Sequence, residues 1–389
     1  EIRGFKVMLG GGLGSQPFLA SITNEFLPED ELIPYIEATL RVFDRHGERN
    51  NRNKARFKYL IQKLGLEEVI RLIEEEKIAN KVKRYDVDRT RIVQPEAPDT
   101  STLTAIDLSD SEAYVLWKET NTFAQKQEGY YGVFVKVSTG DLPTAKSREL
   151  IKGLRGLIAD DIRITQNQGL LLKYATAASL PHIFNLLTRL ELASPGFEST
   201  ADVTTCPGTD TCNLGISNST EMARVIETYI QEFHQDFIYN RRLKIKISGC
   251  MNSCGQHGLA HIGFHGSSVK ANGKVVPAAQ VMIGGGTVGD GFGRVAERII
   301  KVPTKRVLHV VDLVLNDYKK EAIGEEDFHA YYDRQGKNYF YTLLKPLSDL
   351  TNLSDDEYID WGHQETFATA IGVGECAGVV IDLVAVSYT

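Results

Sequence analysis

The sequence predicts an α+β protein in which duplicated ferredoxin-like halves are joined to mixed α/β lobes that carry cysteine loops. Three observations predict this class. The patterns over residues 129–200 run in the order β-α-β-β-α, two glycine-rich segments repeat along the chain, and four of the five cysteines gather in two short loops. The order β-α-β-β-α makes up most of one ferredoxin-like motif.

Composition indicates a globular protein of more than one domain. The chain has 389 residues, of which 42% are hydrophobic and 24% charged, and its net charge is −7. The length predicts two to three domains, and the acidic balance argues against a general nucleic-acid binder. No apolar run is long enough to predict a membrane helix. Cysteines that cluster in pairs fit a reducing compartment better than a disulfide scaffold, so we expect a cytoplasmic protein with no nucleic-acid or membrane partner.

One glycine-rich pattern occurs twice, about 274 residues apart. In the first copy, an apolar strand over 4–9 runs into three glycines that begin with Gly10 and Gly11. In the second copy, another apolar strand runs into three glycines that begin with Gly284 and Gly285. Glycine runs allow a positive φ or a close approach of the backbone to another group.

A proline follows each glycine run at nearly the same distance, Pro28 in the first copy and Pro303 in the second. Each proline opens an apolar-periodic helix, expected over 31–44 and 305–318. The two copies indicate an internal duplication. In the second copy the cysteine loops precede the glycines by 30 to 80 residues, and in the first copy that region would fall before the chain begins. We therefore expect the chain to lack the start of its first repeat.

The two cysteine loops predict a metal centre. Cys206 and Cys212 form a C-x5-C motif, and Cys250 and Cys254 form a C-x3-C motif about forty residues later. Four thiolates are the ligand set of a tetrahedral zinc or of a [4Fe–4S] cluster. Structural zinc sites mostly use closer spacings, so the wider first loop favours a cluster, whose irons are spread further apart. On spacing alone, zinc and a set of unrelated buried cysteines stay open.

Both loops resemble the signature of the sulfite/nitrite reductase family, whose members join siroheme to a [4Fe–4S] cluster. The resemblance rests on residues 205–215 and 248–257, and it covers most of the chain from residue 4 to about 320. It implies that the four cysteines bind the cluster and that Cys254 also bridges to the siroheme iron. It also implies a siroheme contact at Asn252. Met251 departs from the family, which usually has proline there.

Basic residues follow the first glycine run. Arg52, Arg56 and Lys58 lie in a charged stretch, 44–80, that has a helical pattern. Composition alone would make this a solvated helix face. The resemblance implies instead that the three residues hold siroheme, which carries eight carboxylates and needs many Arg and Lys donors. It further implies cofactor contacts at four glycines of the repeat: Gly10, Gly11, Gly284 and Gly285.

A strand–turn–strand pattern over 161–172 carries Arg163, Thr165, Asn167 and Gln168. Ordinary strand alternation would turn polar residues of this kind outward. In the family this hairpin faces the cofactor, so the resemblance implies siroheme contacts for these four residues.

Three histidines and a fifth cysteine remain. His257, His261 and His265 follow the cysteines at four-residue spacing, which would suit a metal site on a helix. Because 260–266 reads as a strand, alternate residues would point to opposite faces, and we expect no histidine metal site. Cys376 is interpreted as a free buried cysteine. The apolar stretch 379–386 is followed by only three residues, so we expect that the C-terminus has been truncated.

These patterns predict five segments. They are 1–83, the remainder of the first siroheme-binding repeat; 84–128, a linker with one short element near 113–117; 129–200, a ferredoxin-like half-module; 201–320, the cluster- and siroheme-binding lobe; and 321–389, a C-terminal extension.

The resemblance implies a six-electron reduction of a small oxyanion, sulfite to sulfide, at a siroheme coupled to a [4Fe–4S] cluster. Nitrite to ammonia by the same cofactors is the alternative. The electron donor would be ferredoxin or a flavoprotein reductase. In the family, the basic residues that bind the substrate lie ahead of the first glycine run, in the part expected to be missing. We therefore name no catalytic residue. An isolated chain without activity would be consistent with this interpretation. Two readings from other classes remain: a non-catalytic iron–sulfur electron-transfer protein and a zinc-stapled module.

Overall fold

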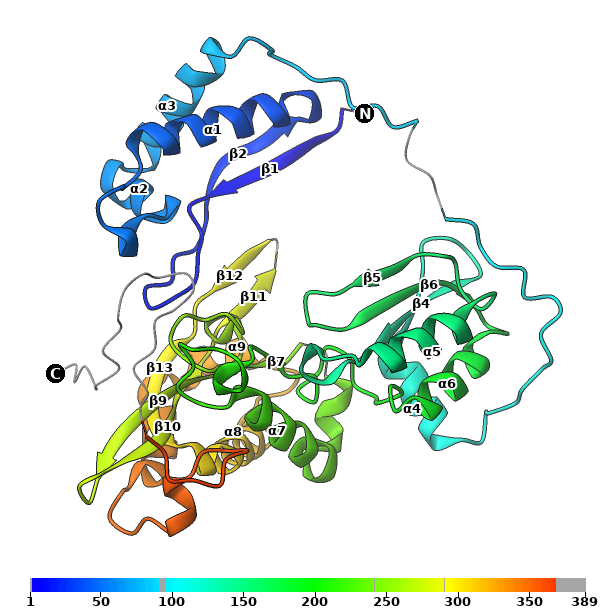
Figure 1. Ribbon diagram of the computed structural model, residues 1–389, viewed down its shortest axis with the longest axis vertical. Coiled ribbons are helices and arrows are strands. Elements are labelled where there is room, and N and C mark those ends of the chain that lie inside the picture. The colour runs from blue at the N-terminus through cyan, green and yellow to red at the C-terminus, as the bar shows by residue number, and fades with distance from the viewer. Residues whose placement is uncertain (1, 91–94, 241, 290, 369–389) are drawn as a thin grey trace. The chain divides into compact units, whose positions relative to one another are not determined.

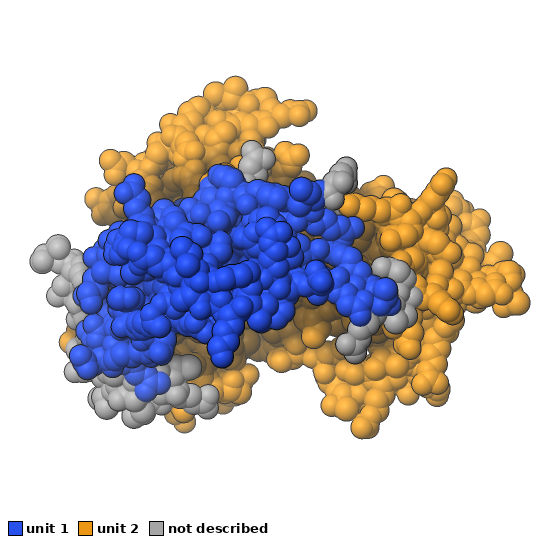
Figure 2. All heavy atoms as spheres, turned by 90° about the horizontal axis from the view of Figure 1, so that it is seen from above, with its two compact units in different colours: residues 1–93 blue, residues 94–389 orange. Residues whose placement is uncertain are grey.

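The computed structural model describes residues 2–90, 95–240, 242–289 and 291–368. The chain divides into two compact units, residues 1–93 and residues 94–389 (Figure 2). Within the described ranges no helix is long and apolar enough to cross a bilayer. Cys376 and the apolar stretch 379–386 lie outside the described residues.

The first unit is a β-hairpin covered by helices. Strand β1 (Gly4–Leu9) pairs antiparallel with β2 (Ser21–Pro28). Helices α1 (Leu32–His46), α2 (Phe57–Leu64) and α3 (Leu66–Ala79) follow. Apolar side chains of β2 and the three helices form the core of this unit: Leu27, Tyr35, Ala38, Val42, Leu60, Val69 and Ile73.

The second unit begins with a small α/β module. Its elements are α4 (Glu112–Asn121), β3 (Thr122–Ala124), β4 (Tyr130–Val135), α5 (Thr144–Leu154), β5 (Ile162–Ile164), β6 (Leu170–Thr176) and α6 (Leu180–Arg189). The strands form one antiparallel sheet in the order β3-β4-β6-β5. The predicted β-α-β-β-α order is confirmed. The short element expected near 113–117 is α4, which buries Trp117 in the core of this module.

The rest of the second unit surrounds a five-stranded sheet in the order β13-β10-β9-β8-β7. The strands are β7 (Thr204–Thr205), β8 (Ile245–Ser248), β9 (Ile262–Ala271), β10 (Lys274–Ile283) and β13 (Glu297–Pro303). Strands β7, β8 and β9 run parallel, whereas β9, β10 and β13 are antiparallel.

Helices and a hairpin complete this lobe. They are α7 (Ser219–Phe233), α8 (Val307–Glu321), α9 (Phe328–Gln335), α10 (Lys337–Leu344) and the strands β11 (Gly286–Gly289) and β12 (Phe292–Arg294). Helices α7 and α8 pack against each other and share one apolar core with the sheet (Figure 1). The α+β class is confirmed.

The predicted internal repeat is visible in the structure. Strands β1 and β2 with helix α1 correspond to β10, β13 and α8. Pro28 and Pro303 each end a strand and precede a 3-10 turn, and each turn leads into a helix of 15 residues. The backbone angles of the two prolines agree closely, with φ −55° and ψ 144° at Pro28 and φ −51° and ψ 141° at Pro303.

The repeat extends further than the sequence pattern indicated. In the first copy α2 and α3 meet at Gly65, and in the second copy α9 and α10 meet at Gly336. Both glycines have a positive φ, +87° and +79°. The helical pair after residue 320, which lies beyond the range expected to resemble the family, is therefore the equivalent of the pair in the first unit.

The two copies differ in what covers their long helices. In α8 the side chains of Val311 and Leu315 are 0% exposed, because α7 and the sheet pack around them. In α1 the equivalent side chains, Ile36 and Leu40, are 44% and 61% exposed. Among the described residues of the first unit, no helix takes the place that α7 has in the second.

Candidate metal centre

The two cysteine loops leave the same edge of the five-stranded sheet. Strands β7 and β8 are parallel neighbours, with Thr205 opposite Ile247. Cys206 follows β7 directly, and Cys250 follows β8 after one residue. Because the carboxyl ends of parallel strands lie side by side, two loops far apart in sequence meet at one place. This edge is where open α/β sheets usually bind ligands.

Gly249 ties the two loops together. Its carbonyl oxygen accepts hydrogen bonds from the amides of Ile216 (2.8 Å) and Ser217 (3.1 Å), which belong to the first loop. Its own amide donates to Cys206 Sγ over 3.1 Å. A Cβ atom at this position would lie 2.5 Å from Gly208 Cα. The loops therefore pack backbone against backbone, and the absence of a side chain makes the contact possible.

Helix α7 begins directly behind the first loop. Asn218 caps the helix, since its side chain accepts from the amide of Glu221 over 3.1 Å. The next residue, Ser219, donates its hydroxyl proton to the carbonyl oxygen of Cys206 over 2.6 Å, and its Oγ lies 3.6 Å from Cys206 Sγ. Cys206 is thus held at two points: its sulfur accepts from the amide of Gly249, and its carbonyl oxygen accepts from the hydroxyl of Ser219.

The four thiols act on one another. The pKa of the Cys250 thiol is raised to about 11, mainly by burial and to a smaller extent by the neighbouring thiols, while a hydrogen bond from the amide of Asn252 acts to lower it. Cys212 and Cys254 are exposed, so the group opens to the surface.

This thiol group has the donor set of a [4Fe–4S] cluster. Within the described ranges, no group of three or more His, Cys, Asp or Glu side chains is placed to hold one metal ion. A [4Fe–4S] cluster bears its four thiolates on separate irons and needs them further apart. The donor set, the opening to the surface and the donors around Cys206 suit that cluster.

The hairpin of the ferredoxin-like module docks on the first cysteine loop. The side-chain amide of Gln168 donates to the carbonyl oxygen of Thr205 over 2.8 Å and accepts from the amide of Thr205 over 2.9 Å. Gln168 adopts a φ of +67° at the hairpin turn. Of the predicted contacts on this hairpin, Gln168 is therefore the one that the structure joins directly to a cysteine loop.

The other hairpin residues are engaged locally. Thr165 Oγ1 accepts from the amide of Gly169 over 3.0 Å, and Asn167 donates to Glu198 over 3.0 Å. Arg163 is exposed and forms an ion pair with Asp161, with 2.8 Å between Nε and Oδ1. The predicted cofactor contacts of these residues stay predictions.

In the first unit, basic residues hold the glycine loop. The Lys58 side chain is 3% exposed, and its ammonium lies 2.5 to 3.3 Å from three backbone carbonyl oxygens, those of Gly12, Leu13 and Gln16. Burial and the nearby Arg56 lower the pKa of Lys58. Arg56 also donates to the carbonyl oxygen of Leu13, and Arg52 is exposed in a 3-10 turn. A role for the three residues in holding siroheme stays a prediction.

The glycines of the repeat allow close packing within each copy. Gly10 has a φ of +83°, and a Cβ atom there would lie 2.5 Å from Ile61 of α2. Gly284 has a φ of +86°, and its Cβ atom would lie 2.6 Å from Tyr332 of α9. Side chains at Gly11 and Gly285 would likewise press on neighbouring atoms, in particular on the amide of Ala296 for Gly285. Close packing therefore explains why glycine occupies these positions, in addition to the predicted contact with the cofactor.

Sequence reasoning missed His329. It is the second residue of α9, just as Lys58 is the second residue of α2, and its Nε2 lies 3.0 Å from the carbonyl oxygen of Gly285. Its ring centroid lies 4.4 Å from that of His261, and the two rings are tilted by 33°. No local sequence pattern could have found it, because the equivalence of His329 and Lys58 against their glycine runs is visible only in the structure.

Three of the buried histidines take part in two ring pairs. His257 and His265 lie with their ring centroids 4.7 Å apart, whereas His261 pairs with His329. Burial lowers the pKa of His257 and of His261 to about 3 and that of His265 to about 4. These rings are neutral at neutral pH, and they fill space behind the cysteine loops and the glycine run.

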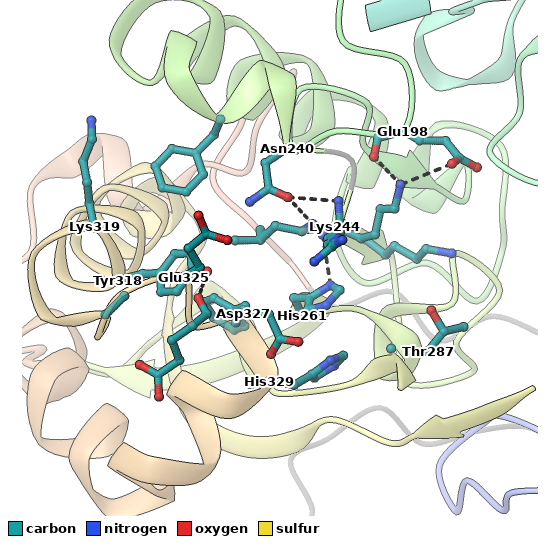
Figure 3. Close-up of a pocket in the computed structure, with 18 of the residues that line it drawn as sticks. Glu198, Asn240, Lys244, His261, Thr287, Tyr318, Lys319, Glu325, Asp327 and His329 are labelled. Atoms are coloured by element: carbon teal, nitrogen blue, oxygen red, sulfur yellow. Dashed lines mark hydrogen bonds and ion pairs between the residues drawn. The ribbon is translucent and has the colours of Figure 1, made fainter. Parts of the chain in front are cut away.

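A cavity of about 820 Å³ lies beside the start of β8 (Figure 3). Lys244 and Lys246 line one side of it, and His261 and Glu198 are also in its wall. The Lys244 ammonium contacts Glu198, and burial lowers the pKa of Lys244 to about 8. None of the four motif cysteines is among its described lining residues. The cavity therefore lies at the opposite end of β8 from the thiols, with both charge signs in its wall.

Comparison with known proteins identifies the family of this fold and of this thiol group. Residues 1–81 and 198–347 match the family described as nitrite and sulphite reductase 4Fe-4S domain. A sulfite reductase [NADPH] hemoprotein beta-component from Geobacillus kaustophilus is 24% identical over 371 residues, which cover 91% of this chain and 57% of that protein. A ferredoxin–nitrite reductase from Synechococcus elongatus is 28% identical over 289 residues, which cover 72% of this chain and 50% of that protein.

A solved structure shares the fold of this chain. The NirA protein of Mycobacterium tuberculosis matches with a TM-score of 0.69 and 23% identity, over 87% of this chain and 58% of that one, and the likeness shows the fold. The chain spans about half the length of the curated relatives it matches. Since the matched ranges make up more than half of its residues, the chain belongs to the nitrite and sulphite reductase 4Fe-4S domain family.

Proposed function

We propose that this chain is part of a reductase that converts a small oxyanion at a siroheme coupled to a [4Fe–4S] cluster, with sulfite to sulfide as the main reaction. Membership in the family implies both cofactors. The observation that carries the proposal is the meeting of both cysteine motifs at the carboxyl ends of β7 and β8. The relatives are named for sulfite and for nitrite, so reduction of nitrite to ammonia is the second candidate.

The proposed cluster ligands are Cys206, Cys212, Cys250 and Cys254, with Cys254 also bridging to the siroheme iron. The amide of Gly249 would go on donating to the Cys206 sulfur when that thiolate is a ligand. When bound, the cluster supplies electrons to the tetrapyrrole iron, where the oxyanion is reduced. Because burial raises the pKa of Cys250, uptake of the cluster releases protons from this pocket.

In the second unit, two proposed siroheme contacts are close to the cysteine loops along the chain or by hydrogen bonding. Asn252 is exposed two residues after Cys250, and the side chain of Gln168 bonds to Thr205, the residue before Cys206. The remaining proposed contacts are Arg163, Thr165, Asn167, Arg52, Arg56, Lys58, Gly10, Gly11, Gly284 and Gly285. Arginine and lysine among them would pair with the carboxylates of siroheme, where a guanidinium can bind both oxygens.

Electrons would reach the site from a separate donor. The relatives' names include ferredoxin in one group and NADPH in the other. We propose a ferredoxin or a flavoprotein reductase as the donor, and a reducing compartment, the cytoplasm, as the location, because free thiols persist there.

The test is anaerobic reconstitution of the full chain with iron, sulfide and siroheme, followed by an absorption spectrum and assays of iron, zinc and sulfide. We expect about five irons per chain and tetrapyrrole absorption bands. Cys250→Ala should lose most of the sulfide, and Cys376→Ala, the matched control at the fifth cysteine, should keep it. Sulfite consumption with an artificial donor should exceed nitrite consumption.

Other results would decide between the alternatives. About four irons with sulfide but no tetrapyrrole bands would support an electron-transfer protein. One zinc and no sulfide in protein handled without oxygen would contradict the proposal and favour a zinc-stapled module.

A further inference from the structure

The segment that follows α10 returns to the cysteine loops. Residues 354–363, here called the C-terminal strap, lie beyond the family-matched range that ends at 347. The strap begins with a short 3-10 helix, Asp355–Tyr358, which Ser354 caps. It is the red part of the chain near α7 and α8 (Figure 1). The strap is held by contacts with the residues that precede α8 and with the first cysteine loop.

Two contacts anchor the strap beside the start of α8. Glu357 forms an ion pair with Arg306, with 2.5 Å between Oε1 and Nε, and both side chains are mostly buried. The indole of Trp361 donates to the carbonyl oxygen of Thr304 over 2.8 Å. Partly buried pairs of this kind hold a segment far better than exposed ones do.

Asp360 reaches the end of the first cysteine loop. Its side chain is 2% exposed, and its Oδ2 accepts a hydrogen bond from the amide of Asn218 over 2.7 Å. Asn218 is the cap of α7 and lies six residues after Cys212. The carboxylate therefore holds the point at which the loop becomes a helix, and its charge is favourable at a helix N-terminus.

His363 reaches the middle of the same loop. Its Nε2 lies 3.3 Å from Thr209 Oγ1, and Thr209 is located between Cys206 and Cys212. Gly362, with a φ of +71°, lets the strap lie close to the start of α7, because a Cβ atom there would be 2.6 Å from Glu221. Two strap residues thus contact the loop that carries half of the thiols.

We propose that Asp360 and His363 are positioning residues that hold the Cys206–Cys212 loop in the shape that binds the cluster. The part of this inference that concerns the cluster rests on the proposed function. The part that concerns the shape of the loop is independent of it. Loss of the Asp360 carboxylate would leave the amide of Asn218 buried without this acceptor, a costly state in a protein interior. It would also remove a negative charge at the end of the first cysteine loop, and such a charge opposes the addition of an electron to the cluster.

The experiment uses the full chain, with and without reconstituted cluster. Asp360→Ala should speed the loss of cluster iron to a chelator about tenfold, and His363→Ala should speed it about threefold. Asp360→Asn keeps an acceptor oxygen, so it should hold the cluster nearly as well as the wild type while raising its midpoint potential. In metal-free protein, Asp360→Ala should increase amide hydrogen exchange over residues 209–217.

Two controls separate positioning from general loss of stability. Asp355→Asn removes an exposed carboxylate from the same strap and should change neither the potential nor the exchange. Leu344→Ala, in the core of α10, should lower Tm without changing the signal of the reduced cluster in electron paramagnetic resonance.

The inference is wrong if Asp360→Ala and His363→Ala match Asp355→Asn in iron loss, potential and exchange. A wild-type chain that takes up no iron and sulfide would contradict the proposed function alone. In that case faster exchange over 209–217 in Asp360→Ala would still support the strap, and unchanged exchange would overturn it.

Discussion

Gln168 and Thr205 form a closed pair of hydrogen bonds, in which one side-chain amide satisfies both backbone groups of the residue before Cys206. The two residues are 37 positions apart and come from different parts of the second unit. The pair joins the ferredoxin-like hairpin to the edge of the sheet that carries the thiols. The position of Cys206 therefore depends on a residue in another module.

Gln168→Ala should destabilise the chain by about 1 to 2 kcal/mol, since it removes two hydrogen bonds and leaves buried backbone groups unpaired. It should also lower the yield of reconstituted cluster. Urea denaturation and iron assay measure the two effects. Asn167→Ala is the matched control, because it removes one side-chain bond to Glu198 on the same turn. Equal behaviour of the two variants would contradict the role given to Gln168.

Gly255→Ala should disrupt the cysteine loops more than other glycine substitutions do. A Cβ atom there would collide with the carbonyl oxygen of Ile247 and lie 2.9 Å from the amide of Cys206. Backbone atoms cannot move aside without shifting β7 or β8, so we expect a loss of about 3 kcal/mol or more and little cluster.

Gly273→Ala is the control for this substitution. Its Cβ atom would meet nothing within 4 Å, and the cost comes from its φ of +73° alone. About 1 to 2 kcal/mol is expected from that strain, with normal cluster content. Thermal unfolding and sulfide assay compare the two variants, and a Gly255→Ala protein with full cluster content would refute the close packing of the loops.

Asp202 should make the chain less stable as pH rises. The side chain is 6% exposed, and burial raises its pKa to about 6, with Lys136 opposing and Glu227 adding to the effect. A folded pKa above the unfolded value means that the contribution is full below about pH 4 and is lost as pH rises through about 6. Asp202→Asn should therefore raise stability at pH 8, by up to about 3 kcal/mol, and leave it unchanged near pH 4.

Asp161 provides the opposite case. Arg163 and Lys173 lower its pKa to about 2, so its contribution is present above about pH 4 and is lost as pH falls through about 2. Asp161→Asn should lower Tm at pH 8. Melting curves of both variants at pH 8 and at pH 4.5 test the signs, and a stabilising Asp161→Asn at pH 8 would reverse the expectation.

Leu315→Ala and Leu40→Ala compare equivalent positions of the two repeat copies. Leu315 is 0% exposed in α8, so its truncation should cost about 2 to 5 kcal/mol. Leu40 is 61% exposed in α1, and its truncation should change stability by less than about 0.5 kcal/mol. Denaturant titrations measure both values. A large cost at Leu40 in this chain would show that its outer face is covered in solution.

Local patterns in the sequence were sufficient for most elements and for the thiols. The apolar periodicity of α1 and α8, the proline before each, and the alternation in β8 depend on neighbouring residues, so they can be read along the chain. Cysteine spacing identified the four thiols for the same reason. The helices α9 and α10 could not be recognised as a repeat of α2 and α3, because what the pairs share is a backbone turn at Gly65 and Gly336 and the same packing on a glycine run.

The sequence by itself determined most of the secondary structure, the core of the duplication and the family, because each depends on residue types at short spacing. Tertiary structure decided which side chains meet the thiols. Gln168, Ser219 and Asp360 touch the first cysteine loop or its end from distances of up to 142 residues along the chain. The geometry also directed Lys58 to the carbonyl oxygens of its own loop. Such contacts depend on how sheets and loops pack, and no short-range pattern encodes them.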